Sequence, residues 1–184
     1  CHYLIDRKGQ IIKMVDENKV AWHAGKSKWK NYINLNRYSI GIELVNKGHK
    51  FGYEKFTNIQ LKNLIKLCLQ LKKKYKIKNS NIVGHSDVAP HRKVDPGEKF
   101  PWARISRHKI GIWYKKINFF REKLENKKIQ KFFFINLHKI GYRYFELKRR
   151  TKNDIFLIKA FQRRFNPSNV SGKIDQKTYI ISHF

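Results

Sequence analysis

The sequence predicts an α/β domain, in which helices flank a mixed β-sheet, followed by a small all-α domain of three helices. Short apolar segments with strand periodicity occur before residue 85, and an amphipathic helical pattern lies among them. Beyond residue 128 the pattern is purely helical. Strands mixed with a covering helix favour an α/β architecture, and 184 residues leave room for one domain and a small module.

Two strands are expected to form a β-hairpin at the start of the chain. Residues 2–5 and 10–15 are apolar or alternating, and a lysine-glycine turn separates them. A third strand is expected at 39–45, where side chains alternate between the two faces. Glu43 then lies on the face opposite the isoleucines, and Gly41 on the same face leaves space beside the carboxylate.

A helix is expected at 57–75. Thr57 can act as its N-cap, and Gln60 completes a capping box. A cysteine on its apolar stripe is expected to be a buried thiol. The stripe follows helical spacing and consists of Leu61, Leu64, Ile65, Cys68, Leu71 and Tyr75.

The composition divides the chain into two domains. Residues 1–114 contain all the predicted strands and form the candidate catalytic domain. Residues 115–127 are mostly polar and lack a strong apolar stripe, which predicts a linker. Residues 128–184 form the predicted helical domain.

Three helices are expected in that second domain. The first covers 128–140 and is ended by Gly141. The second covers 151–165, with Thr151 as its N-cap. The third is short and is capped by Asp175.

The chain is strongly basic, with 42 Lys and Arg against 13 Asp and Glu and a formal net charge of +29. Such a charge attracts polyanions, including nucleic acids and anionic envelopes. The basic residues are spread along the chain and form neither one face nor one tail. We therefore predict no specific nucleic-acid partner. No run approaches the roughly 18 apolar residues of a membrane span, so no transmembrane segment is expected.

Residues 84–97, GHSDVAPHRKVDPG, carry the strongest functional signal. A short strand expected at 81–84 presents His85 at its carboxyl end, and Asp95 follows on a loop that two prolines stiffen. An imidazole and a carboxylate are two of the three protein ligands of a typical catalytic zinc site, which keeps one position open for water. In an extended loop Lys93 points to the same side as Asp95, where an ammonium can stabilise an oxyanion.

Each of these residues also has a structural interpretation. A single histidine at a strand end is more often part of a core than a metal ligand, and Asp95 could cap the turn that follows it. Glu43 could be an exposed mid-strand carboxylate. With 42 basic residues in the chain, Lys93 could lie near the site by chance. The residues alone leave these alternatives open.

Five segments resemble, in order, the motifs of the type 2 N-acetylmuramoyl-L-alanine amidases, a family related to the peptidoglycan-recognition proteins. The resemblance covers residues 1–113, and its specificity comes from the number and order of the motifs. They are CHYLI with its turn at 1–9, AWHAG at 21–25, NLNRYSIGIEL at 34–44, GHSDVAPHRKVDPG at 84–97, and DPG followed by FPW at 95–102.

The resemblance implies roles for individual residues. His85 and Asp95 match two zinc ligands, and the third, a histidine at the end of an apolar strand, is expected upstream of Cys1. Glu43 matches the catalytic carboxylate. Lys93 matches the lysine that stabilises the tetrahedral intermediate.

The resemblance further implies a zinc-dependent hydrolase that cleaves the amide bond between N-acetylmuramic acid, or its 1,6-anhydro form, and L-alanine. The substrate would be peptidoglycan or muropeptides, in cell-wall degradation or recycling. Trp22, His23 and Asn36 are the expected substrate-binding residues. Arg37 departs from the Asp that close relatives usually carry, which affects the expected substrate contacts near it.

The C-terminal pattern resembles the three-helix peptidoglycan-binding module that often follows amidase domains. The expected compartment is the periplasm or cell envelope of a Gram-negative-type bacterium. Two other functions stay open: a non-catalytic peptidoglycan-binding protein and, ranked lower, a nucleic-acid-binding protein driven by charge. The former would not cleave muropeptides, and the latter would bind any duplex with a steep salt dependence.

Overall fold

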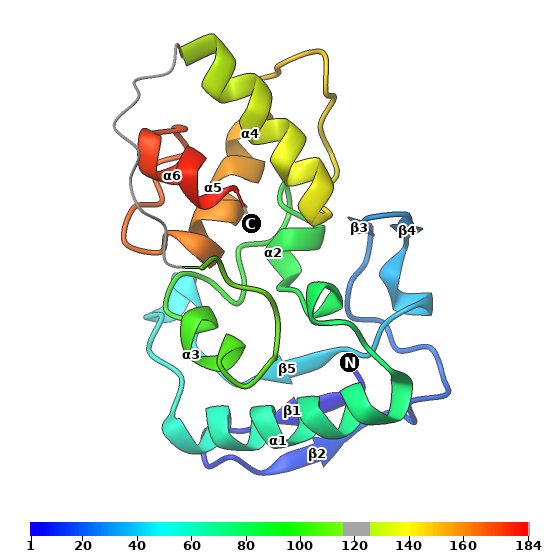
Figure 1. Ribbon diagram of the computed structural model, residues 1–184. Coiled ribbons are helices and arrows are strands. Elements are labelled where there is room, and N and C mark those ends of the chain that lie inside the picture. The colour runs from blue at the N-terminus through cyan, green and yellow to red at the C-terminus, as the bar shows by residue number, and fades with distance from the viewer. Residues whose placement is uncertain (116–125, 184) are drawn as a thin grey trace.

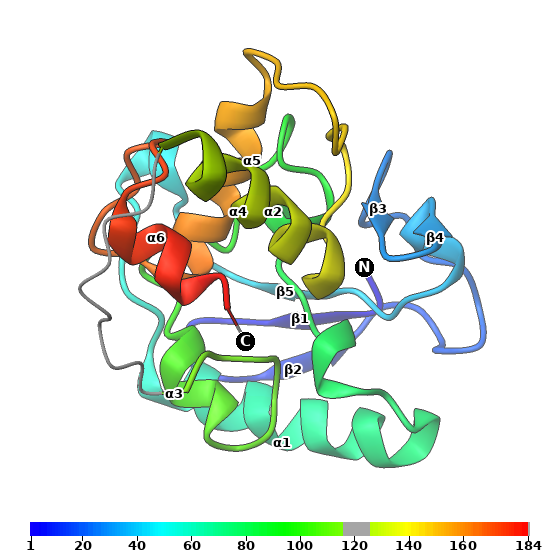
Figure 2. The same cartoon turned by 45° about the horizontal axis from the view of Figure 1, so that its top comes forward.

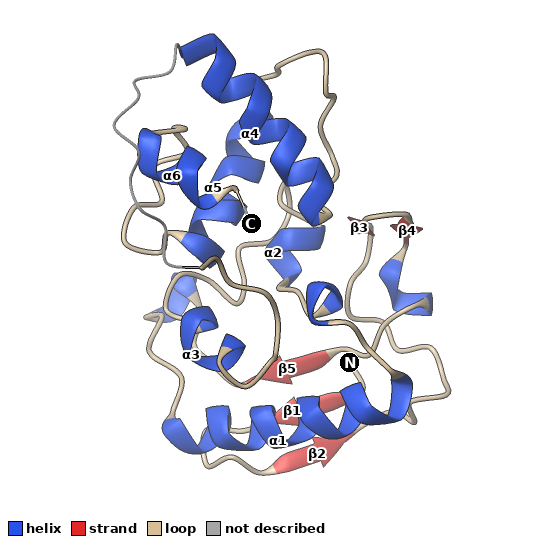
Figure 3. Cartoon of the chain, viewed as in Figure 1, coloured by secondary structure: helices blue, strands red, loops and turns tan. Residues whose placement is uncertain are grey.

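The computed structural model describes residues 1–115 and 126–183, which form a sheet-containing region and a helical region (Figure 1). The strands of the first region and the helices around them are distinguished in Figure 3. In chain order the elements are β1 (Tyr3–Ile5), β2 (Ile11–Lys13), β3 (Lys28–Trp29), β4 (Tyr32–Ile33), η1 (Leu35–Arg37), β5 (Ile42–Leu44), η2 (His49–Phe51), α1 (Asn58–Tyr75), η3 (Asn79–Asn81), α2 (His85–Val88), α3 (Trp102–Ser106), α4 (Asn126–Ile140), α5 (Asp154–Phe165) and α6 (Gln176–Ile181).

The main sheet is mixed, as the sequence predicts. Its order is β2-β1-β5, with β1 antiparallel to β2 and parallel to β5. The predicted hairpin is confirmed, and the strand predicted at 39–45 is present in shorter form. Helix α1 runs alongside the sheet (Figure 2), where Ile5 and Leu64 are buried in one core.

Local sequence signals set the ends of three helices. At the start of α1 the Gln60 N–H donates to the Thr57 hydroxyl (3.2 Å), and the Thr57 N–H donates to Gln60 Oε1 (3.1 Å). Helix α4 ends directly before Gly141, and the Asp175 carboxylate accepts from the Thr178 N–H (2.7 Å) to cap α6. These ends are the predicted ones.

Helix α5 begins at Asp154 rather than directly after Thr151. The Thr151 hydroxyl donates to Asp154 Oδ1 (3.2 Å), and the Thr151 N–H donates to Asp154 Oδ2 (3.1 Å). The hydroxyl therefore serves as a donor to the carboxylate. Residues 152–153 form a turn before the helix starts.

The prediction of a strand at 81–84 is wrong. Asn81 ends η3, and Ile82 and Gly84 have extended backbones, yet no strand in the described part of the chain pairs with them. An apolar segment forms a β-strand only where a neighbouring strand provides backbone hydrogen-bond partners. His85 is instead the first residue of α2, a helix of four residues.

A second, two-stranded sheet pairs β3 with β4, and the sequence did not predict it. Each strand has only two residues, too few for a periodic pattern. The buried Trp29 on β3 meets Tyr142 of the helical region edge to face, with ring centroids 5.1 Å apart. The Lys30 N–H donates to the Gly141 carbonyl (2.8 Å). The small sheet thus contacts the helical region.

One hydrophobic core crosses from the first region into the second. It joins Val88 and Ala89, close to His85, with Phe133 of α4 and Phe161 of α5. The predicted linker lies mostly at 116–125, outside the described residues. Over the residues that the structure describes, no helix combines the length and the apolar character needed to cross a membrane.

Candidate metal and catalytic site

The structure brings His85 and Asp95 together. His85 Nδ1 lies 3.1 Å from Asp95 Oδ2, and the Ser86 N–H donates to the Asp95 carbonyl (2.8 Å). The His85 side chain is 17% exposed and that of Asp95 is 56% exposed. The pair is therefore held by the fold on the histidine side and open to an incoming ligand on the carboxylate side.

The surroundings of the His85 ring fit a metal ligand. Its Nε2 lies 3.1 Å from the Ala24 carbonyl, so both ring nitrogens face oxygens that only accept hydrogen bonds. A neutral imidazole has one N–H, and donation to Ala24 leaves the Nδ1 lone pair directed at the Asp95 carboxylate. A second proton or a cation at this position resolves the conflict. Metal-bound histidines commonly donate their other N–H to a backbone carbonyl, as His85 can here.

The surroundings of the Asp95 carboxyl favour its ionised form, because its pKa is lowered. Desolvation by burial alone would raise the pKa of the Asp95 carboxyl, although the side chain is 56% exposed. When His85 is protonated, its hydrogen bond and its charge outweigh that effect and lower the pKa of Asp95, with smaller contributions from the Asp95 backbone N–H and from Lys93. Lys93 is thus close enough to act on the site electrostatically, as expected for a residue two positions away.

Glu43 lies on the predicted face of β5. Ile40, Ile42 and Leu44 pack toward the core with α1, and the Glu43 side chain is exposed on the other face. Gly41 shares the face of Glu43, and the His23 ring lies directly over it. Ala24, the neighbour of His23, is the residue that binds His85. Glu43 therefore belongs to the side of the sheet that faces the candidate site.

The loop at 21–25 is held by Asn36. Its side-chain oxygen accepts from the N–H groups of His23 (3.0 Å) and Ala24 (2.7 Å). Asn36 is buried, at 9% exposure, and its side-chain oxygen holds the loop in position through these two hydrogen bonds. Trp22 in the same loop is 86% exposed and available to a ligand.

His23 is a neutral imidazole in this environment. Burial lowers the pKa of His23 to about 4, and the backbone hydrogen bond with Ser39 only partly opposes this shift. Its Nε2 is buried without a hydrogen-bond partner among the described residues. The neighbouring His2, by contrast, uses both ring nitrogens, with Gly41 N–H (3.0 Å) and the Lys19 carbonyl (3.0 Å).

Replacing Gly41 with alanine should destabilise the protein by about 1–3 kcal/mol, because the added methyl group enters occupied space. A Cβ at this position would lie 2.3 Å from Cγ of the His23 ring. Denaturant unfolding measures the loss. In the double variant with His23→Ala the two losses should not add, since removal of the ring clears the space. Strict additivity would show that the ring does not lie against Gly41.

Arg92 is a contributor to the site that the sequence analysis missed. Its Nη2 donates to the carbonyls of Ala24 (2.6 Å) and Lys26 (3.2 Å). The Ala24 carbonyl is therefore shared between Arg92 and His85. In a chain with 42 basic residues, no sequence signal separates this arginine from the others.

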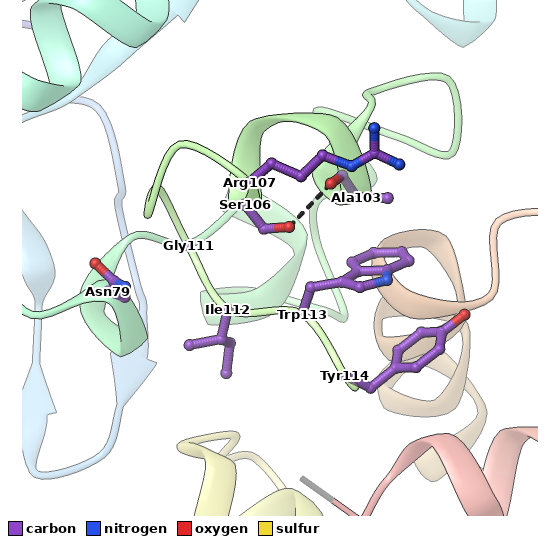
Figure 4. A pocket seen from close by; sticks show the side chains of 8 residues that line it. All are labelled: Asn79, Ala103, Ser106, Arg107, Gly111, Ile112, Trp113 and Tyr114. Carbon is purple, nitrogen blue, oxygen red and sulfur yellow. Dashed lines mark hydrogen bonds between the residues drawn. The ribbon is translucent and has the colours of Figure 1, made fainter. Parts of the chain in front are cut away.

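A hollow of about 430 Å³ lies away from this site (Figure 4). Trp113 stacks on Tyr114 in its wall, with ring centroids 4.9 Å apart, and Arg107 and Asn79 also line it. None of the predicted site residues lines this hollow. The candidate site is thus identified by its side chains and not by a cavity.

The chain is similar to known proteins over almost its whole length. The N-acetylmuramoyl-L-alanine amidase family matches residues 1–98. The N-acetylmuramoyl-L-alanine amidase AmiD of Escherichia coli is 33% identical over 98% of this chain and 71% of AmiD. The 1,6-anhydro-N-acetylmuramyl-L-alanine amidase AmpD of Haemophilus influenzae is 41% identical over 56% of this chain and 54% of AmpD.

Solved structures show the same fold. The complex of E. coli AmiD with anhydro-N-acetylmuramic acid-L-Ala-D-gamma-Glu-L-Lys has a TM-score of 0.80 at 30% identity, covering 98% of this chain and 76% of that one. AmpDh3 of Pseudomonas aeruginosa has a TM-score of 0.83 at 29% identity, covering 99% and 79%. The predicted α/β fold followed by helices is confirmed. The chain belongs to the N-acetylmuramoyl-L-alanine amidase family, and it is therefore an enzyme of the class for which that family is named.

Proposed function

We propose that the chain hydrolyses the amide bond between N-acetylmuramic acid and L-alanine with the help of a zinc ion, for which His85 and Asp95 provide two ligands. The observation that carries the zinc assignment is the approach of His85 Nδ1 to Asp95 Oδ2 while Nε2 faces the Ala24 carbonyl. The described residues contain no group of three or more His, Cys, Asp or Glu side chains suited to a metal ion. The third ligand is the histidine that the family resemblance implies.

The remaining residues supply the proton transfers and the charge. Zinc, when bound, supplies Lewis-acid chemistry toward water and a carbonyl oxygen. Glu43 takes the proton of the attacking water and passes it to the leaving amine. The Lys93 ammonium stabilises the negative charge that develops on the carbonyl oxygen. The exposed position of Glu43 and the electrostatic contact of Lys93 with Asp95 support these roles.

The proposed substrates are muropeptides with a 1,6-anhydro-N-acetylmuramic acid end, or the peptidoglycan from which they derive. Solved relatives support this choice, since structures of AmiD and AmpDh3 are known in complex with anhydromuramic peptides. Trp22 offers an exposed indole for substrate contact, and the half-buried ring of His23 lies next to it in the chain. For Asn36 we propose an indirect contribution, through the loop that carries both residues.

For the helical region we propose contact with peptidoglycan, in the periplasm or cell envelope. The resemblance of residues 128–184 to a peptidoglycan-binding module supports this proposal. The match to AmiD also extends over 98% of this chain, which includes the helices.

A metal chelator should abolish muropeptide cleavage, and added zinc should restore it. The expected loss is essentially complete, because both the water activation and part of the oxyanion stabilisation depend on the ion. Release of the peptide from an anhydro-muropeptide, followed by chromatography, measures the activity, and added magnesium serves as the control. Cleavage at the full rate in metal-free protein would contradict the zinc proposal. Absence of cleavage in the zinc-loaded protein would favour a non-catalytic binding protein.

A further inference from the structure

A buried ion pair joins the segment that presents His85 to the helical region. Asp87 is 1% exposed, and Arg164 of α5 is 3% exposed. Arg164 Nη1 donates to Asp87 Oδ2 at 2.5 Å, and the Tyr142 hydroxyl donates to Asp87 Oδ1 at 2.6 Å. Tyr142 is fully buried. Both donors come from the helical region, and their acceptor lies two residues after His85.

The same groups also bind the backbone directly before His85. Asp87 Oδ2 accepts from the Gly84 N–H (2.8 Å), and Arg164 Nη2 donates to the Ile82 carbonyl (3.1 Å). Ile82 and Gly84 have extended backbones without a paired strand among the described residues. Buried backbone groups need hydrogen-bond partners. At this segment the ion pair supplies partners that a neighbouring strand would otherwise provide.

Docking of the two regions does not by itself require a buried charge pair. Removing two charges from water is costly, and apolar side chains of similar size often stabilise an interface as well or better. A shared apolar core already joins the regions. Arg164 stacks over the Trp102 ring at 3.9 Å, and its Nε is buried without a partner among the described residues. The pair of Asp87 and Arg164 adds directional hydrogen bonds, and all of them involve residues 82–87.

The constraint extends to the second candidate ligand. The Ser86 N–H donates to the Asp95 carbonyl (2.8 Å), so a fixed α2 also holds the Asp95 backbone. Arg163, the neighbour of Arg164, places Nε 4.0 Å from Glu98, three residues after Asp95. Two adjacent arginines of α5 thus reach the two segments that present the candidate ligands.

We propose that Arg164 and Tyr142 are positioning residues of the metal site: through Asp87 they fix the backbone that presents His85. The helical region then helps to position a zinc ligand, in addition to any contact that it makes with the cell wall. This inference rests on the proposed role of His85 as a zinc ligand. Partners of this kind around a metal site are commonly worth roughly 10–100-fold in metal affinity.

The test compares Arg164→Lys and Tyr142→Phe in the whole protein. Lysine retains a charge near Asp87 but cannot bind Asp87 and Ile82 with one planar group. Phenylalanine removes only the hydroxyl that donates to Asp87. Competition with a chromogenic chelator gives the zinc dissociation constant, denaturant unfolding of the zinc-free protein gives its stability, and muropeptide cleavage gives kcat and KM. We expect zinc binding to weaken roughly 10–100-fold in Arg164→Lys and several-fold in Tyr142→Phe.

Two variants elsewhere in the helical region serve as matched controls. Arg150 also pairs with a carboxylate, that of Asp154 at 3.3 Å, and stacks over Phe134 at 3.6 Å. Tyr179 is a second buried tyrosine of the same core, at 9% exposure. Arg150→Lys and Tyr179→Phe should lower the stability without changing the zinc dissociation constant.

Arg164→Lys and Tyr142→Phe are the two network variants, because both residues bind Asp87. The inference is overturned if they change the zinc affinity no more than their controls do. If Arg164→Lys does not fold, Tyr142→Phe against Tyr179→Phe decides alone. His85→Ala is measured in parallel. Unchanged zinc binding in His85→Ala would reject the proposed function itself, whereas loss of zinc in His85→Ala with normal affinity in the network variants would reject only the positioning role.

Discussion

Glu43→Gln should lower kcat by about 10²–10⁴-fold, the usual contribution of a general acid–base group. Glutamine has the size of glutamate but cannot accept the proton of the attacking water. The fold should tolerate the change, because the Glu43 side chain is exposed and forms no hydrogen bond or ion pair with a described residue. Its free energy of unfolding should stay within about 0.5 kcal/mol of the unchanged protein.

The control for this variant is Glu146→Gln, which removes the same charge from an exposed position in the helical region. Steady-state cleavage of an anhydro-muropeptide measures kcat and KM, and elemental analysis measures bound zinc. We expect a large loss of kcat with unchanged zinc content for Glu43→Gln, and normal values for the control. A Glu43→Gln enzyme with full turnover would remove Glu43 from the catalytic role and return it to an ordinary strand carboxylate.

The features that the sequence predicted depend on residues close together in the chain. The capping box of α1 needs only Thr57 and Gln60, and the end of α4 needs only Gly141. The hairpin of β1 and β2 follows from one tight turn. The proximity of His85 and Asp95 was also predictable, because the two residues lie only ten positions apart in a proline-containing segment.

The features that the sequence missed depend on contacts between distant residues. The apolar run at 81–84 looks like a strand, but a strand exists only where another one pairs with it. Arg164 binds Asp87 across 77 residues, and nothing local distinguishes it from the other basic residues of the chain. The Asn36 side chain accepts hydrogen bonds from the backbone of His23 and Ala24, and nothing in the sequence around Asn36 predicts these contacts. Such contacts appear only when the chain is folded.

His85→Ala should abolish stoichiometric zinc binding and, with it, muropeptide cleavage. Alanine removes one of the proposed ligands, and the remaining contacts of the 84–97 segment cannot replace an imidazole. Arg92 still holds the Ala24 carbonyl that His85 binds, so the loop at 21–25 keeps one of its anchors. His108→Ala, at an exposed histidine of the same region, is the control and should bind zinc normally. Unchanged zinc stoichiometry in His85→Ala would exclude His85 from the metal site.

Asp95→Asn separates a metal ligand from a simple ion pair, because the two roles predict different dependence on zinc. An exposed ion pair contributes about 0–1 kcal/mol, so in zinc-free protein the variant should lose little stability. A ligand that binds only the folded state at 100 times its dissociation constant adds about 2.7 kcal/mol. The unchanged protein should therefore gain stability when zinc is added, and Asp95→Asn should gain much less. Equal gains in both proteins would mean that Asp95 only pairs with His85, and the proposed zinc site would lose its carboxylate.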